Sequence, residues 1–338
     1  MHSYIAVVHV DGNGMGQRIM DIGTAHMTSE SNRSYVNALR GFSDGVAKAS
    51  QAALKATLAQ LGAKIRDGKI IHPTLPKVSV ALAIDKDTHK ALLPFRPIVV
   101  GGDDVTFVCD GRLGLSLAFE YLRQFEDETV KSPACNGRIT ASAGIAMVKT
   151  HYPFARAYGL AEELCKSAKT YRRKQKLEGS CLDWHFALGG LAGDIDHIRE
   201  RDTVKTGRLT VRPVTLDKRL PGTDQECSWE VVWQGIRAFQ DLPPTTSPDE
   251  RPKWSVRRNK VKALRDALRE GESAVERFRT AFNKEEKLPD VGLGDDCREK
   301  GWYGDRCPYF DAIELADWFI PLEGGESHDA AASSGTQK

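Results

Sequence analysis

Apolar and polar positions over the first half of the chain follow a pattern that predicts a mixed sheet and helix domain. Residues 5–10 form a short apolar run that ends in Asp11-Gly12-Asn13-Gly14, as expected for a buried strand followed by a glycine-rich turn. A polar loop follows. Apolar residues then recur every three or four positions over about residues 34–61, which predicts an amphipathic helix.

The segments that follow predict further strands, with a second acidic turn between two of them. Residues 97–100 are an apolar run that leads into Gly101-Gly102-Asp103-Asp104. Residues 105–109 then alternate between apolar and polar or smaller side chains, as expected for the returning strand of a hairpin. The same kind of pattern predicts strands at 78–84, 139–148 and 180–186, and helices around 118–125 and 154–168.

The order of these elements predicts an α+β fold. Strand, helix, strand, strand, helix, strand, helix, strand is the order of a ferredoxin-like antiparallel sheet with helices on one face. In such a sheet the first strand and the central hairpin are neighbours, so we expect the turn at Asp11 to lie beside the turn at residues 101–104. This domain is expected over residues 1–190. A mostly helical C-terminal region is expected over 191–322, and the small, polar tail 323–338 is expected to be disordered.

Charge and cysteine content narrow the class of protein. Among 338 residues, 48 Lys and Arg balance 46 Asp and Glu, so the net charge of +2 gives no general argument for nucleic-acid binding. No apolar run approaches the ~18 to 20 residues of a membrane span, and the first residues lack a secretory pattern. We therefore expect a cytoplasmic protein with no membrane contact. Seven cysteines, an odd number without a common zinc spacing even at Cys297 and Cys307, favour reduced thiols.

Three acidic residues are candidates for metal-dependent chemistry. Two-metal nucleotidyl transfer needs several carboxylates that converge on a pair of divalent cations, and Asp11, Asp103 and Asp104 could supply them. Glycines before the acidic pair would let the backbone approach a phosphate closely. The motif Gly-Gly-Asp-Asp alone is also typical of an ordinary solvated turn. The Asp-ended strand, the hairpin context and the later helix with Lys166 and Lys169 favour the metal site.

Four segments together carry a resemblance to a known family. They are residues 8–14, the hairpin 99–105, the strand 142–146 and the helix 161–169. They resemble the catalytic palm of the type III CRISPR large subunit, which is similar to GGDEF diguanylate cyclases and makes cyclic oligoadenylates from ATP. The match covers about residues 4–187 in the family's order. Residues 209–213 and 258–271 resemble segments of the same subunit's helical C-terminal region.

The domain content differs from that of the complete large subunit. That subunit also has a nuclease domain and a first palm, for which we expect no room in this chain. A single palm is similar to the stand-alone minimal CRISPR polymerases, which are linked to anti-phage signalling and produce cyclic dinucleotides. The larger helical C-terminal region distinguishes this chain from the smallest members of that group.

The resemblance implies a set of site residues. Asp11, Asp103 and Asp104 would bind two Mg²⁺ or Mn²⁺ ions. Lys169 would contact the triphosphate, although a solvated helix face is an equal alternative for this residue. Arg173 lies in a basic run at a helix C-terminus, which the helix dipole also favours. The remaining residues that the resemblance places against the nucleotide are Gly12, Asn13, Gly14, Gly101 and Gly102.

The function that follows is a nucleotidyltransferase that converts ATP into a cyclic di- or oligoadenylate. Ring closure requires two nucleotides that face each other, so a homodimer with two palms face to face is expected, and a downstream effector would sense the product. One alternative is a palm polymerase that extends a template or primer. Another is a scaffold or sensor that binds ATP without turnover.

Other features are weighed against simpler explanations. A basic stripe, defined here as Arg258, Lys262, Arg265 and Arg269, could hold RNA or a phosphate, but a solvated helix face is more frequent, so RNA binding is not favoured. His9 is expected to be a satisfied core residue. The C-terminal tryptophans are expected to build a core rather than to stack on bases, and they are Trp229, Trp233, Trp254, Trp302 and Trp318.

Overall fold

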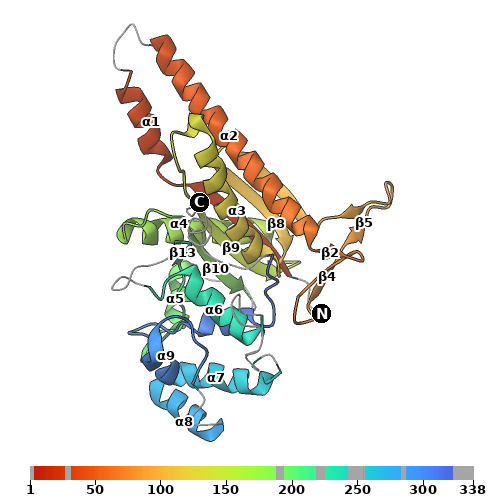
Figure 1. The fold of residues 1–338 in the computed structure, drawn as a ribbon, viewed down its shortest axis with the longest axis vertical. Helices are drawn as coiled ribbons and strands as arrows, with labels where there is room; N and C mark the ends of the chain where they lie inside the picture. Colours follow the sequence, from red (N-terminus) through yellow and green to blue (C-terminus); the bar gives the residue numbers. More distant parts are fainter. Residues whose placement is uncertain are drawn as a thin grey trace, which may run out of the picture. The chain divides into compact units, whose positions relative to one another are not determined.

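The computed structural model describes residues 4–26, 32–187, 194–217, 225–242, 254, 256–282 and 287–322 (Figure 1). The chain divides into two units: unit 1 comprises residues 1–68 and 82–188, and unit 2 comprises 69–81 and 189–338. The predicted domain border at residues 190 and 191 lies outside the described residues, and so does the predicted disordered tail 323–338. Unit 2 includes a segment, 69–81, that the sequence analysis did not assign to it.

Unit 1 is built on a sheet in which the first strand is central. Its strand order is β10-β9-β1-β8-β7. Strand β1 pairs antiparallel with both β8 and β9, β7 pairs antiparallel with β8, and β10 runs parallel to β9. This is the predicted ferredoxin-like arrangement with one strand added at the edge. The strands are β1 Tyr4–Gly12, β7 Phe95–Gly101, β8 Asp104–Asp110, β9 Ala141–Lys149 and β10 Cys181–Ala187.

Helices cover both faces of this sheet. Helices α2 (Asn32–Ala63) and α3 (Gly114–Lys131) pack together, and Gly114 at the start of α3 lies against Ala6 and Ile145 (Figure 1). Helix α4 (Phe154–Lys174) lies against Gly144. Because neighbouring residues in a strand point to opposite faces, α4 covers the face that α2 and α3 leave open. The expectation that all helices share one face therefore holds for α2 and α3 but not for α4.

Helix α1 (Met15–Thr24) replaces the polar loop that the sequence predicted after the first turn. None of its residues is buried, although Met15, Ile19 and Ile22 stand at helical spacing, a signal that the sequence analysis did not use. The helix begins directly after Gly14, whose φ of 72° is left-handed and suits glycine. The short elements of unit 1 are β2 Ile65–Arg66, β5 Ala83–Ile84, β6 Ala91–Leu92 and the 3-10 turn η2 Pro133–Cys135.

Unit 2 is mostly helical, as predicted. Trp229, Trp233, Trp254 and Trp302 are buried, which confirms their expected place in a core, whereas Trp318 is only half-buried. Its helices are α5 Ile195–Arg201, α6 Trp229–Phe239, α7 Arg258–Glu270, α8 Glu272–Phe282, α9 Gly294–Lys300 and α10 Phe310–Leu315. Its short strands are β3 Lys69–Ile71, β4 Ser79–Ala81, β11 Thr203–Val204, β12 Gly207–Arg208 and β13 Val214–Thr215.

The hairpin of β3 and β4 is attached to the rest of unit 2 by polar contacts. Thr74 Oγ1 donates a hydrogen bond of 2.6 Å to the backbone carbonyl of Gln240. His72 is buried in the same turn, and its Nδ1 accepts hydrogen bonds from the backbone N–H groups of Thr74 and Leu75. Burial lowers the pKa of His72, with the Gln240 side chain offsetting part of this effect.

The basic stripe of α7 packs against α10 and the residues after it. Arg258 forms an ion pair of 3.0 Å with Asp317, and Arg265 forms one of 3.6 Å with Glu314. The Arg269 guanidinium lies 4.7 Å from the centre of the Phe310 ring. The stripe nevertheless stays at the surface, with 52% of the Arg258 side chain and 41% of the Arg265 side chain exposed, as expected for a solvated face. Three of its four cations form surface contacts with α10 or the residues after it.

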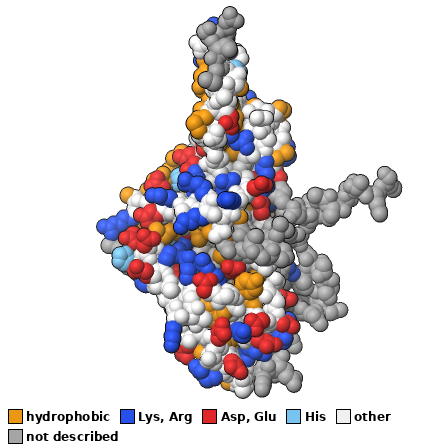
Figure 2. Space-filling view, turned by 90° about the vertical axis from the view of Figure 1, so that its left-hand side faces the viewer, with side chains coloured by type: hydrophobic (Ala, Val, Ile, Leu, Met, Phe, Trp, Pro, Cys, Tyr) orange, Lys and Arg blue, Asp and Glu red, His pale blue; other side chains and the backbone are white. Residues whose placement is uncertain are grey.

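The cysteines and the surface charges agree with the sequence analysis. All seven cysteines are buried and in the thiol form. Figure 2 shows Lys and Arg side chains interspersed with Asp and Glu on the face that it presents, in line with the net charge of +2. Among the helices of the described residues, none combines the length and the apolar character needed to cross a membrane.

Candidate active site

The end of β1 and the turn between β7 and β8 bring three carboxylates to one place. Val10 pairs with Val105, so that Asp11 follows at the strand end next to Asp104. Gly101 pairs with Asp104, which leaves Gly102 and Asp103 as a two-residue turn. Gly102 has a φ of 65°, the left-handed value that the first central position of such a hairpin favours.

Asp103 and Asp104 are carboxylates with raised pKa values. Burial is the main cause for Asp103, and the negative charge of Asp11 adds to it. Burial is again the main cause for Asp104, with contributions from Asp11 and Asp103, while His9 acts in the opposite direction. The backbone of Gly12 also approaches Asp103 closely, because a Cβ at Gly12 would lie 2.7 Å from Asp103 Oδ2. The site therefore concentrates negative charge in a partly dehydrated place.

Helix α4 points a cation at this cluster. Lys169 Nζ lies 2.5 Å from Asp11 Oδ2, and it donates a hydrogen bond of 2.9 Å to the carbonyl oxygen of Gly12. Gly144 makes this possible, since its missing side chain lets β9 touch the backbone of α4 at Ala161. The alternative of a solvated helix face for Lys169 is thereby excluded, as its side chain is only 20% exposed.

Two further residues lie near the acids: His9, which is the hydrogen-bonded core residue that the sequence predicted, and Glu162, which was not predicted as part of the site. His9 is buried, its Nδ1 is 3.1 Å from Thr106 Oγ1, and the same nitrogen is 3.6 Å from Asp104 Oδ1. Glu162 of α4 raises the pKa of Asp104 by its charge. The sequence carries a signal for both: His9 is two residues from Asp11 on one strand face, and Glu162 is seven residues from Lys169 on one helix face.

The charge of this cluster fits divalent cations. Asp104 Oδ1 is buried and has no hydrogen-bond partner among the described residues. This unpartnered oxygen and the raised pKa values of Asp103 and Asp104 indicate a site whose negative charge is not balanced by nearby cations. Within the described part of the chain, however, no three His, Cys, Asp or Glu side chains stand close enough together to hold a metal ion. Asp11 instead holds Lys169.

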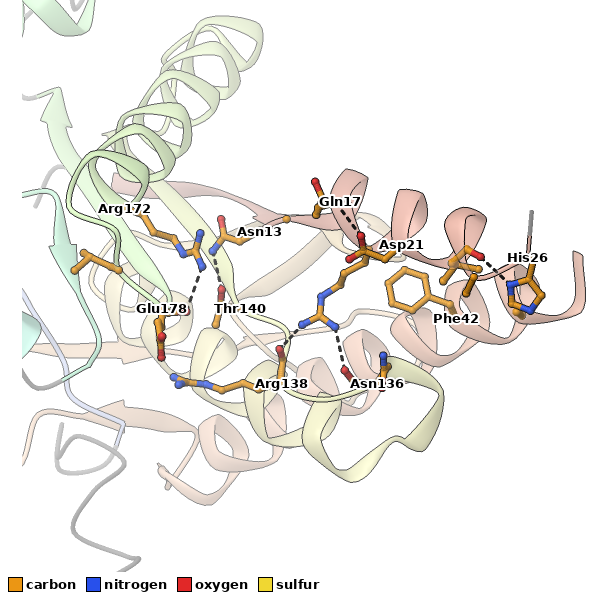
Figure 3. Close-up of a pocket in the computed structure, with 16 residues that line it drawn as sticks. Asn13, Gln17, Asp21, His26, Phe42, Asn136, Arg138, Thr140, Arg172 and Glu178 are labelled. Atoms are coloured by element: carbon orange, nitrogen blue, oxygen red, sulfur yellow. Dashed lines mark hydrogen bonds between the residues drawn. The ribbon is translucent and has the colours of Figure 1, made fainter. Parts of the chain in front are cut away.

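A pocket of about 720 Å³ opens beside Asn13 and Gly14 (Figure 3). Asn13 is itself buried: its Nδ2 donates to Thr140 Oγ1, and its Oδ1 accepts a hydrogen bond from Ser142 Oγ. These bonds fix the Asp11 turn to the start of β9. The other lining residues are Gln17, Arg18, Asp21, Ile22, Ala25, His26, Ala38, Phe42, Asn136, Arg138, Thr140, Arg172, Leu177 and Glu178.

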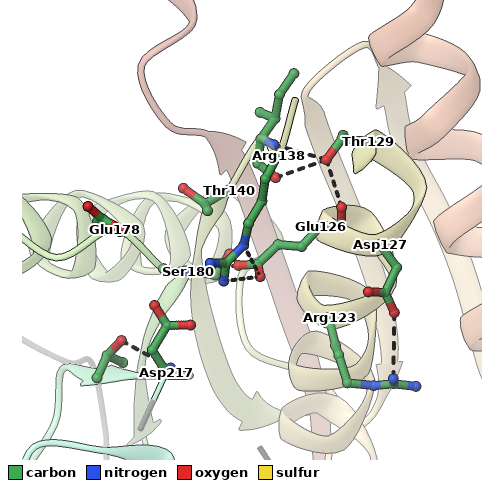
Figure 4. A network of polar contacts seen from close by, with 12 residues as sticks. Arg123, Glu126, Asp127, Thr129, Arg138, Thr140, Glu178, Ser180 and Asp217 are labelled. Carbon is green, nitrogen blue, oxygen red and sulfur yellow. Dashed lines mark hydrogen bonds and ion pairs between the residues drawn. The ribbon is translucent and has the colours of Figure 1, made fainter. Parts of the chain in front are cut away.

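One buried carboxylate fixes part of the pocket wall (Figure 4). Glu126 of α3 accepts hydrogen bonds from Arg138 Nε at 2.9 Å and from the backbone N–H of Ser180 at 3.0 Å. The Ser180 hydroxyl donates to the same carboxylate. The backbone of Arg138 in turn accepts a bond of 2.6 Å from Arg18 of α1. The loops before β9 and β10 are therefore held in place at the pocket.

Arg172 and Arg173, two basic residues in the last turn of α4, have different environments. Arg172 lines the pocket, and its guanidinium donates to the backbone carbonyls of Glu178 and Gly179. Arg173, which the sequence analysis preferred as a phosphate contact, is exposed. The helix geometry separates the two, since neighbouring residues on a helix do not share a face.

Comparison with known proteins assigns the family. The profile of one family, described as Cas10/Cmr2, second palm domain, matches residues 4–178. The chain belongs to this family. The match places the palm fold of the Cas10/Cmr2 second palm domain on residues 4–178, and the resemblance to the type III CRISPR large subunit is confirmed. No curated protein sequence matches the chain.

Solved structures that match the chain include two that contain Csm1. One is a Csm1-Csm4 cassette in complex with pppApApA, with 13% identity and a TM-score of 0.48 over 94% of this chain and 37% of that chain. The other is Csm1 in T. onnurineus, with 14% identity and a TM-score of 0.47 over 93% of this chain and 37% of that chain. The chain thus spans less than two fifths of the length of either protein.

Proposed function

We propose that this chain is a nucleotidyltransferase that joins ATP molecules into a cyclic oligonucleotide and releases pyrophosphate. The observation that carries the proposal is the cluster of Asp11, Asp103 and Asp104 at one end of the palm sheet, with Lys169 directed at it. Membership in the Cas10/Cmr2 second palm family supports a nucleotide as the substrate. A pocket within the usual size range of small-molecule sites borders Asn13 and Gly14 of the same turn, although its lining includes neither the three acids nor Lys169.

The chemistry assigned to the site is an exchange of phosphoryl bonds. A ribose hydroxyl of one ATP attacks the α-phosphate of another, the hydroxyl loses its proton, and the bond from the α-phosphate to pyrophosphate breaks. Divalent cations, which Asp11, Asp103 and Asp104 would hold, supply activation of the hydroxyl and stabilise the leaving pyrophosphate. Lys169 adds a fixed positive charge for the triphosphate, and the backbone at Gly101 and Gly102 leaves space for its approach.

The same chemistry supports a homodimer. One palm presents one acidic cluster, whereas closing a ring requires that each of two nucleotides is attacked in turn. Two palms face to face would provide this. The cyclic product would then act as a second messenger for an effector in anti-phage defence, as family membership suggests.

The test is to identify the products of the purified protein. Each nucleoside triphosphate is incubated with Mg²⁺ or Mn²⁺, and products are identified by liquid chromatography and mass spectrometry. We expect a cyclic adenylate from the native chain and from the control Asp44→Ala, whose carboxylate is exposed on α2. Neither Asp103→Ala nor Asp104→Ala should form it. A linear product that depends on added RNA would favour the polymerase, and metal-dependent ATP binding without any product would favour the sensor.

A further inference from the structure

Lys169 is the nearest partner of the carboxylate that ends β1. Its Nζ lies 2.5 Å from Asp11 Oδ2 and also bonds to the carbonyl oxygen of Gly12. Both oxygens belong to the strand end that the proposed function assigns to metal binding. The ammonium therefore stands where a divalent cation would find one of its ligands.

Within the described part of the chain, the other two acids have no comparable cation. Asp104 has only His9 at 3.6 Å, and its Oδ1 has no hydrogen-bond partner among the described residues. Asp103 lies next to Gly12. The charge of Lys169 lowers the pKa of Asp103, but less than burial raises it. Lys169 is therefore committed to Asp11, and within the described residues the three carboxylates as they stand are not close enough together to hold a metal ion.

We infer that Lys169 couples nucleotide binding to divalent-cation binding by transferring from Asp11 to the triphosphate. The inference rests on the proposed function, since it takes the acids as the cation site. An ammonium is a compact charge on a flexible stem, so it can exchange one anionic partner for another. A triphosphate carries more negative charge than one carboxylate and draws the ammonium away. Asp11 is then released to join Asp103 and Asp104.

This coupling must be reciprocal. If the triphosphate raises the affinity for the cation, the cation raises the affinity for the triphosphate by the same factor. Lys169→Met keeps a long apolar side chain but removes the positive charge. Asp11 then has no ammonium partner even when no nucleotide is bound. We expect this variant to bind Mn²⁺ without nucleotide roughly five- to tenfold more tightly than the native chain, near the lower end of typical coupling factors. Its affinity for nucleotide should fall, and the coupling factor should approach one.

The experiment measures binding rather than turnover. Free Mn²⁺ is followed by electron paramagnetic resonance, first without nucleotide and then with a non-reactive ATP analogue that has a methylene bridge between the α- and β-phosphates. Lys169→Arg keeps the charge and should retain the coupling. Lys48→Met removes an exposed lysine from α2 and should behave as the native chain does. Circular dichroism establishes that each variant is folded.

Two results would overturn the inference in different ways. If folded Lys169→Met binds nucleotide-free Mn²⁺ no more tightly than the native chain, Lys169 does not compete for Asp11, while the proposed function stands. If Mn²⁺ binding is the same in Asp103→Ala and Asp104→Ala as in the native chain, with and without nucleotide, the acids are not the cation site. The inference and the proposed metal chemistry then fail together.

Discussion

At the scale of single residues, the ionised forms of Asp103 and Asp104 that the proposed chemistry needs lower the stability of the fold. Their pKa values are raised, so the folded chain binds protons there more readily than the unfolded chain does. Stability from this source is present below the ordinary pKa of about 3.8 and is lost as pH rises through the raised values. At neutral pH the fold therefore carries an unfavourable charge that it would not need for stability alone.

Asp103→Asn should remove this unfavourable charge and abolish product formation. Asparagine has a similar size but cannot ionise. The partly exposed site screens the effect, so we expect a rise in the thermal midpoint of about 1–3 °C at pH 7, comparable to a change of up to 1 kcal/mol in a domain of this size. The gain should shrink as pH falls toward 4. Differential scanning calorimetry measures both, with Asp44→Asn as the control, and a lower midpoint at pH 7 would contradict the argument.

Gly12 should be required for the position of Asp103. A Cβ at residue 12 would lie 2.7 Å from both Cβ and Oδ2 of Asp103, so Gly12→Ala must displace that side chain. We expect product formation to fall about tenfold or more, because small displacements in a catalytic site are costly. The free energy of unfolding should fall by roughly 1–3 kcal/mol.

Gly16→Ala is the matched control for this substitution. Gly16 lies four residues further on in α1 and has open space around its Cα. Alanine there should raise the free energy of unfolding by about 0.5–1 kcal/mol through helix propensity and leave activity unchanged. Full activity in Gly12→Ala would show that Asp103 tolerates displacement.

Sequence reasoning found the acids of the site more readily than their neighbours. Asp11 and the 101–104 turn stand out because acids end apolar runs, and the order of elements predicts that they meet. His9 is the bonded core residue that was predicted, and its approach to Asp104 follows from the pairing of β1 with β8. Glu162 was missed because its link to the acids depends on how α4 docks on the sheet.

At the scale of elements, the contact between β9 and α4 determines where Lys169 points. Gly144 has no side chain, and a Cβ there would lie 2.0 Å from the carbonyl oxygen of Ala161 and 2.3 Å from the backbone nitrogen of Cys165. Backbone atoms cannot move aside as a flexible side chain can. The helix therefore reaches the strand only because residue 144 is glycine.

Gly144→Ala should separate the two elements. We expect the free energy of unfolding to fall by about 3 kcal/mol, at the upper end of overpacking effects. Activity in the remaining folded protein should fall as well, because Lys169 moves with α4. Gly159→Ala, in the same helix but with open space around it, should instead be neutral or stabilising by up to about 1 kcal/mol. Urea denaturation compares them, and equal stability of the two variants would argue against a tight contact.

Element types were predicted well, and their placement less so. The periodicity of residues 154–168 identified a helix but not the sheet face that it covers. A signal was present, since residues 141–148 are buried without alternation, as expected for a strand covered on both faces. Helix α1 was missed because its apolar residues Met15, Ile19 and Ile22 span only two turns and lie among glycines and polar residues.

At the scale of the whole molecule, the proposed reaction predicts the association state. Ring closure needs two acidic clusters, so the protein should sediment as a dimer when ATP analogue and Mg²⁺ are present. Analytical ultracentrifugation tests this across protein concentrations, with Asp103→Asn as a variant that should keep the dimer but lose the product. A monomer under all of these conditions would argue against ring closure between two palms.

The division of the chain was harder to predict than its fold class. Residues 69–81 lie between elements of the palm in sequence, and their short strands resemble any surface hairpin. They group with unit 2 through contacts with distant residues such as the bond from Thr74 to Gln240. Local patterns carry no information about partners that are 166 positions away.

The burial of all seven thiols makes the chain suitable for site-specific spectroscopy. Burial raises the pKa of Cys165, Cys297 and Cys307 to about 12, which keeps these sulfurs protonated and slow to react at neutral pH. A single cysteine placed on the surface, for example Lys166→Cys, should therefore take up a maleimide dye while the native protein does not. Fluorescence from such a label could follow α4 as ligands arrive, without first removing any natural cysteine.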